Sequence, residues 1–210
     1  VIIREMEKLG LAIREDSMGN LFGRMAGKGF ASHPIGIGSH IDTVPQGGNY
    51  DGMVGVVAAL SVIEQLQAEG GTQRPVEIIL FAAEESSRFA MATMGSKALC
   101  GRANFSEWLK MKDKEGRPFE DVIRENGFDP AKLSETIRQP GEWAAFLELH
   151  IEQGPMLERA EENIGIVSAI AGATRVKIFI KGRADHSGAT PMGERTDALV
   201  AAAGVIVAVE

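Results

Sequence analysis

The sequence predicts an α/β fold in which an open sheet is flanked by helices. Three short apolar runs, at residues 35–40, 76–83 and 146–151, predict buried strands. Each run ends in polar or charged residues, and a helical pattern at 54–67 separates the first two runs. Open α/β sheets bind their ligands beyond the carboxyl ends of the strands, so the polar residues at these ends are the candidates for function.

The other elements follow from local signals. Residues 1–9 predict an amphipathic helix that ends at Gly10, and residues 20–25 predict a short strand before a turn at 27–29. The helix at 54–67 has a buried face, because Val54, Val57, Ile63 and Leu66 recur at helical spacing.

Residues 102–142 form the least regular part of the chain. They contain a turn around Gly116 and a short helix at 119–126 that ends before Gly127 and Pro130.

Two units are expected, at 1–170 and 171–210. The first unit is incomplete at both ends, because the chain lacks an initial Met and both begins and ends inside apparent helices. The second opens with an alternating strand at 175–181, continues through a polar loop at 182–193 and ends in an Ala/Val-rich helix that runs to 210.

The composition excludes several classes of protein. With 210 residues, 44% of them hydrophobic, the chain can bury a core, and its net charge of −7 with interspersed signs argues against nucleic-acid binding. The single cysteine, Cys100, excludes an internal disulfide and favours a reducing compartment. No secretory signal is present, and the longest apolar stretch, 199–209, is too short for a bilayer. We therefore expect a cytoplasmic protein that binds neither nucleic acid nor membrane.

His40 and Asp51 are the first candidates for chemistry. The loop between them contains Gly47 and Gly48, and Gly52 directly follows Asp51. The conformational freedom of these glycines allows the chain to fold back and bring the two side chains together. Asp42, two residues after His40, is placed to accept the proton of the other imidazole nitrogen and so to orient the ring.

The acidic pair Glu84–Glu85 and the histidine His150 follow the other two apolar runs. Adjacent carboxylates at a strand end point in different directions, so one can bind a metal while the other exchanges protons. A set of histidines and carboxylates without thiolates suits Zn²⁺, Mn²⁺ or Co²⁺. A lone histidine is more often structural and a lone glutamate pair is usually solvated, and His33, beside Pro34, is interpreted in that way. The coincidence at three strand ends favours a metal site.

These residues stand in recognisable motifs, which read in chain order SH-x-D, YDG, EESSRF, ELHIEQGP and DHSGATPM. Their order resembles the carbamoylase branch of the di-metal aminoacylase and carboxypeptidase superfamily, which includes N-carbamoyl-L-amino acid hydrolase, allantoate amidohydrolase and β-ureidopropionase. The match extends across nearly the whole chain. It implies a zinc-peptidase-like sheet flanked by helices for 1–170, and the start of an α+β lid or dimerisation domain for 171–210, hence a homodimer.

The resemblance also implies a role for each candidate. His40, Asp51 and His150 would bind one metal ion, with Asp51 bridging to a second ion that Glu85 binds. Glu84 would be the general base, and Gln153 and His186 would contact the substrate. The family takes a last metal-binding histidine, an asparagine and a substrate-binding arginine from a C-terminal portion beyond residue 210.

We therefore expect two divalent metal ions and hydrolysis of a linear C–N bond in an N-carbamoyl amino acid or a ureido compound such as allantoate. Two alternatives stay open. A di-metal aminopeptidase or N-acyl amino acid deacylase shares most of the ligands but usually has a carboxylate where His150 stands. A truncated, non-catalytic fragment would instead dimerise through the lid. His186 also has a plain structural interpretation, as a turn residue that caps the following helix.

Overall fold

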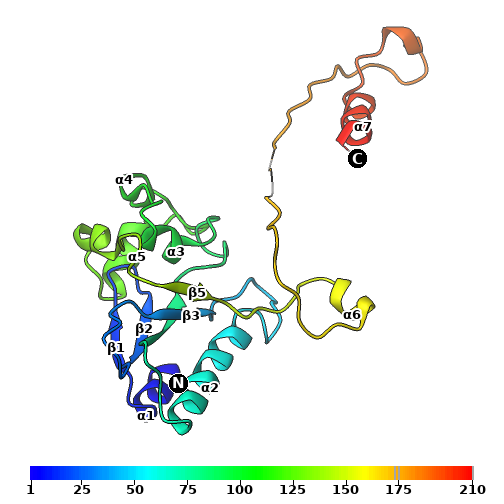
Figure 1. The fold of residues 1–210 in the computed structure, drawn as a ribbon. Helices are drawn as coiled ribbons and strands as arrows, with labels where there is room; N and C mark the ends of the chain where they lie inside the picture. The colour runs from blue at the N-terminus through cyan, green and yellow to red at the C-terminus, as the bar shows by residue number, and fades with distance from the viewer. Residues whose placement is uncertain (173, 175, 210) are drawn as a thin grey trace. The chain divides into compact units, whose positions relative to one another are not determined.

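The computed structural model describes residues 1–172, 174 and 176–209. The chain divides into two compact units, Val1–Ala160 and Glu161–Glu210. The division falls earlier in the chain than the expected boundary after residue 170, and the extent of a catalytic region stays a prediction. In the first unit, helices flank a five-stranded sheet (Figure 1), which confirms the predicted α/β class.

The sheet of the first unit is mixed, with the strand order β1-β2-β4-β3-β5. The strands are β1 (Ala12–Glu15), β2 (Leu21–Met25), β3 (Ile35–His40), β4 (Val76–Phe81) and β5 (Ala145–Leu147). β1 and β2 run antiparallel to their neighbours, whereas β3 is parallel to both β4 and β5. The carboxyl ends of β3, β4 and β5 therefore meet at one edge of the sheet, as the sequence predicts.

Helices account for most of the remaining regular structure of the first unit. They are α1 (Ile2–Lys8), α2 (Met53–Ala68), α3 (Met94–Leu99), α4 (Phe105–Trp108), α5 (Phe119–Glu125), the 3-10 helix η1 (Pro130–Thr136) and α6 (Met156–Ala160). Helix α2 connects the parallel strands β3 and β4, which need a crossover of this kind.

The core lies on both faces of the sheet, because side chains alternate along a strand. In β4, Ile78 and Leu80 belong to the cluster that also contains Met6 of α1 and Ile63 of α2. Ile79 points to the opposite face, where it packs with buried side chains of β2 and α3. The segment that contains α3, α4, α5 and η1 adds a third cluster around Trp108. This packing fixes the edge of the sheet that carries the candidate residues.

The strands and helices expected around β2, β3, α2, β4 and α5 are confirmed, and β1 and α3 are elements that the sequence did not predict. The strand expected at 146–151 is wrong beyond Leu147. Beyond Leu147 the chain is no longer paired with β3; the Glu148 side chain accepts from the Ser39 hydroxyl, and Nε2 of His150 lies 3.3 Å from the Asp51 carboxylate.

The second unit contains the 3-10 helix η2 (Met192–Glu194) and helix α7 (Ala198–Val209). Helix α7 confirms the expected Ala/Val-rich helix, although its predicted last residue, 210, lies outside the described residues. The strand expected at 175–181 is wrong for 176–181, which have no regular secondary structure, and Arg175 lies outside the described residues. A strand needs a neighbour to pair its backbone groups, and no other strand exists among the described residues of this unit. None of the described helices is long and apolar enough to cross a membrane.

Candidate metal centre

His40 and Asp51 form the buried centre of the site. His40 is the last residue of β3 and Asp51 lies just before α2, and both are nearly inaccessible to solvent. Between Asp51 and the helix, Gly52 has a φ of +64°, and a Cβ at this position would lie 2.5 Å from the His40 ring. Only glycine tolerates both the left-handed backbone and this close approach. The glycine-containing loop therefore brings the two side chains together, as the sequence predicts.

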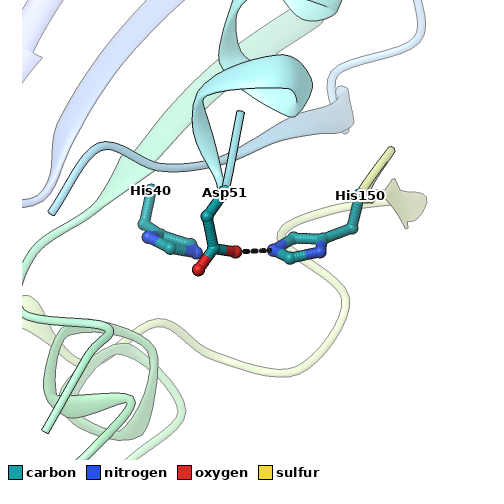
Figure 2. A group of neighbouring side chains, drawn as sticks. All are labelled: His40, Asp51 and His150. Atoms are coloured by element: carbon teal, nitrogen blue, oxygen red, sulfur yellow. Dashed lines mark ion pairs between the residues drawn. The ribbon is translucent and has the colours of Figure 1, made fainter. Parts of the chain in front are cut away.

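His150 joins this pair from the segment after β5. Its Nε2 lies 3.3 Å from Oδ1 of Asp51, and its ring centroid lies 5.7 Å from that of His40. Figure 2 shows the Asp51 carboxylate between the two imidazole rings. Each of the three residues offers one ligand atom within 4.8 Å of the others, which is the spacing that a shared cation requires.

Both histidines have Nδ1 bonded to a main-chain carbonyl. Nδ1 of His40 donates to the carbonyl oxygen of Asp42 at 2.8 Å, and Nδ1 of His150 donates to that of Ile151 at 2.9 Å. A proton held on Nδ1 leaves the lone pair of Nε2 free to bind a metal, and metal-binding histidines usually make such a hydrogen bond. The donor set therefore fits a divalent cation.

Glu84 and Glu85 form a second group with His40, again with ligand atoms within 4.8 Å of one another. Oε2 of Glu84 lies 3.8 Å from Nε2 of His40. Burial raises the pKa of the Glu84 carboxyl, the nearby Asp42 raises it further, and His40 opposes the rise. Burial also raises the pKa of Glu85, with additional contributions from Glu84 and Asp51. Both carboxyls therefore hold a proton more readily than a free glutamate does.

The turn that carries this pair is held by two residues from other segments. The Asn20 amide oxygen accepts from the Ala82 N–H at 2.9 Å, and the Asp42 carboxylate accepts from the N–H groups of Glu84 and Glu85. The main-chain carbonyl oxygen of Asp42 bonds to Nδ1 of His40. The Asp42 carboxylate, which was expected to accept this proton, lies 3.7 Å from Nδ1 and does not bond to it. Sequence reasoning missed Asn20, whose only signal is a polar residue at the start of an apolar strand.

The residues around His150 also contact the centre. Gln153, expected at the substrate, donates from Nε2 to Oδ1 of Asp51 at 2.9 Å. The Ser39 hydroxyl, fully buried before His40, donates to Glu148 at 2.5 Å. Ser39 was not singled out from the sequence, although a serine inside a buried strand is a recognisable signal.

His186, the other residue expected at the substrate, lies in the second unit. Its Nδ1 accepts from the N–H groups of Gly188 and Ala189, both at 3.1 Å, so Nε2 carries the proton of the neutral ring. The side chain of Arg195 closes the same loop by donating to the carbonyl oxygens of Ser187 and Thr190. Asp197 caps helix α7, accepting from the Leu199 N–H at 2.8 Å, so His186 caps its own turn and not the helix.

The model of peptidase family M20/M25/M40 matches residues 36–208. The chain belongs to this family. It is 41% identical over 206 residues to an N-carbamoyl-L-amino acid amidohydrolase of Geobacillus stearothermophilus, covering 98% of this chain and 50% of the relative. It is also 41% identical over 199 residues to allantoate amidohydrolase of Escherichia coli K12, covering 94% of this chain and 48% of that protein.

Solved structures agree with this membership of the M20 family. A hydantoinase/carbamoylase family amidase from Burkholderia ambifaria matches with a TM-score of 0.76 at 32% identity, covering 98% of this chain and 50% of that one. The resemblance predicted from the motifs is therefore confirmed. The chain spans about half the length of the curated relatives it matches. M20 enzymes depend on metal ions, in agreement with the two ligand groups found here.

Proposed function

We propose that the protein hydrolyses the linear C–N bond of an N-carbamoyl amino acid or a ureido compound such as allantoate, with two divalent metal ions. The observation that carries the proposal is the convergence of His40, Asp51 and His150 beside the Glu84–Glu85 pair. The relatives named N-carbamoyl-L-amino acid amidohydrolase and allantoate amidohydrolase support the substrate class. The products of carbamoyl hydrolysis would be the free amine, ammonia and carbon dioxide.

The ligands divide between the two ions in the proposal. His40, Asp51 and His150 would hold one ion, while Asp51 would bridge to a second ion held by Glu85. Divalent cations at these positions supply the acidity that activates water and the positive charge that polarises the substrate carbonyl. Zn²⁺, Mn²⁺ and Co²⁺ all suit imidazole and carboxylate ligands.

Glu84 is the proposed general base. Its carboxylate lies 3.8 Å from Nε2 of His40, beside the proposed ions, where it can take a proton from the attacking water, and the same carboxylic acid can then protonate the leaving nitrogen. Gln153 is the proposed substrate contact beside Asp51. His186 is proposed to donate from Nε2 to the developing oxyanion. Because its Nδ1 accepts hydrogen bonds from the backbone, Nε2 carries the proton that this role requires.

Two further proposals concern the assembly and location of the protein. A homodimer through the second unit is supported by the exposed apolar side chains of helix α7, including Leu199 and Ile206, because such surfaces usually contact another surface. A cytoplasmic location is supported by the cysteine content, a single Cys100.

The Glu84→Gln variant of the full-length protein tests the proposed chemistry. The amide cannot accept a proton from water, so we expect kcat to fall by ~10²–10⁴-fold while metal content, measured by plasma mass spectrometry, stays unchanged. Glu158→Gln, an exposed change on helix α6, is the matched control and should keep full activity. Turnover of Glu84→Gln near the level of the control would refute the role of Glu84.

Parallel assays separate the proposal from its closest alternative. His150 favours carbamoyl hydrolysis over a di-metal aminopeptidase or N-acyl deacylase, which usually carries a carboxylate there. N-carbamoyl amino acids, allantoate, N-acyl amino acids and dipeptides should be compared at equal concentration. Preferential hydrolysis of a dipeptide or N-acyl substrate would overturn the proposed substrate class.

A further inference from the structure

We propose that Asp42 is a positioning residue that sets the Glu84–Glu85 turn through its main-chain amides, and that its side chain does not act on His40. This inference rests on the proposed function, because it assigns Asp42 to the half of the metal centre that contains Glu85.

The side chain and the main chain of Asp42 have different hydrogen-bond partners. Its Oδ1 accepts from the Glu84 N–H at 3.2 Å and its Oδ2 from the Glu85 N–H at 2.9 Å, so one carboxylate spans two successive amides. The Asp42 carbonyl oxygen accepts from Nδ1 of His40 at 2.8 Å, whereas its carboxylate lies 3.7 Å from that nitrogen. The main-chain carbonyl of Asp42 therefore bonds to the His40 imidazole, whereas the Asp42 side chain bonds to the backbone of Glu84 and Glu85.

The turn needs such an acceptor because its backbone has left the sheet. β4 ends at Phe81, and Ala83 has a φ of +47°, a left-handed conformation that costs a non-glycine residue roughly 1–2 kcal/mol. The carbonyl oxygens of Ala83 and Glu84 accept from the start of α3, at Met94 and Thr93. The N–H groups of Glu84 and Glu85 take no part in these bonds, and Asp42 accepts from both of them.

The different partners of the Asp42 side chain and main chain predict which metal ion a substitution of Asp42 weakens. Removing the carboxylate of Asp42 frees the backbone that carries Glu84 and Glu85 but leaves the carbonyl oxygen that orients His40. Loss of a residue that positions a ligand typically weakens metal binding by ~10–100-fold. The loss should fall on the ion that Glu85 binds and spare the ion bound by His40, Asp51 and His150.

The experiment is a calorimetric Zn²⁺ titration of the metal-free, full-length protein and its Asp42→Ala and Asp42→Asn variants. We expect two equivalents in the wild type and, in Asp42→Ala, one equivalent of unchanged affinity and one weakened ~10–100-fold. Asp42→Asn keeps one acceptor oxygen and should show a smaller loss. Asp129→Ala is the matched control, because it removes another carboxylate that accepts from a backbone amide, that of Ala131, at the start of η1. It should bind like the wild type.

Three results would overturn the assignment. Loss of the ion bound by His40, or equal weakening of both ions, would mean that the carboxylate acts through the imidazole. Unchanged binding in Asp42→Ala would mean that the amide contacts do not matter. If Asp42→Ala fails to fold, Asp42→Asn carries the same test. A wild-type protein that binds no Zn²⁺ would refute the proposed function itself. The wild-type titration therefore tests the proposed function, and the variants test the role of Asp42.

Discussion

The chain segments that follow β4 and β5 both carry candidate ligands, but they are held in different ways. After β4, the amides of Ala82, Glu84 and Glu85 all donate to the side chains of Asn20 and Asp42. After β5, residues 148–155 have no regular structure, and their polar contacts with the sheet edge come mainly from Ser39 and from Asp51 itself. The segment after β4 is anchored through its backbone amides, whereas the segment after β5 is anchored through its own side chains, those of Glu148, His150 and Gln153.

The difference follows from the position of each strand in the sheet. β4 lies between β2 and β3 and is buried along nearly its whole length. β5 is a short edge strand that pairs only with β3, and all of its residues are exposed. A central strand fixes the direction of the chain that leaves it, while an edge strand needs additional anchors. The predictions below test whether those anchors act where the structure places them.

The largest effect is expected from Glu77→Ala. Glu77 is buried in β4 and accepts from Arg138 at 2.8 Å and from the Trp143 indole at 2.7 Å, and both donors lie just before β5. Removing one partner of a buried ion pair leaves the other uncompensated, so the free energy of unfolding should fall by ~3–5 kcal/mol. Urea denaturation measures the loss. Glu64→Ala, an exposed change on α2, should cost little, and a Glu77→Ala loss as small as that of this control would show that the anchor is not required.

A smaller effect is expected from Asn20→Ala, which acts on the segment after β4. The change removes the hydrogen bonds to the part-buried Ala82 N–H and to the Gly95 carbonyl, each of which contributes roughly 0.5–1.5 kcal/mol. Hydrogen exchange should become faster at residues 82–85 and stay unchanged at 148–150. Asn126→Ala, which removes an amide contact at the end of α5, is the control. Faster exchange in both segments would contradict their independence.

The smallest effect is expected from Ser39→Ala. The change removes one hydrogen bond to Glu148, for which we expect a loss of ~1 kcal/mol in unfolding free energy. Its result should be local, with weaker Zn²⁺ binding at the group that contains His150 and unchanged exchange at 82–85. Ser61→Ala, on the exposed face of α2, serves as the control. Unchanged Zn²⁺ affinity in Ser39→Ala would show that the serine does not help to place His150.

Much of this arrangement could be predicted from the sequence. The apolar runs predicted β3 and β4, and the polar residues at their ends are brought together because parallel strands end at one edge. The motifs predicted the family. Asn20 and Ser39 could not be assigned, because their partners lie far away in the sequence and depend on the sheet order. The strand predicted at 146–151 extends too far, because Leu149 and Ile151 continue the apolar pattern. In the structure the pairing with β3 ends at Leu147, and Glu148 and His150 contact Ser39 and Asp51 through their side chains.

The central claim is that His40, Asp51 and His150 form a metal centre. A crystal structure of the full-length protein grown with Zn²⁺, with anomalous data collected on both sides of the zinc absorption edge, tests it most directly. We expect an anomalous peak at ~2.0–2.2 Å from Nε2 of both histidines and from a carboxylate oxygen of Asp51. Fully bound Zn²⁺ elsewhere in the molecule, with no anomalous peak between these three side chains, would contradict the claim.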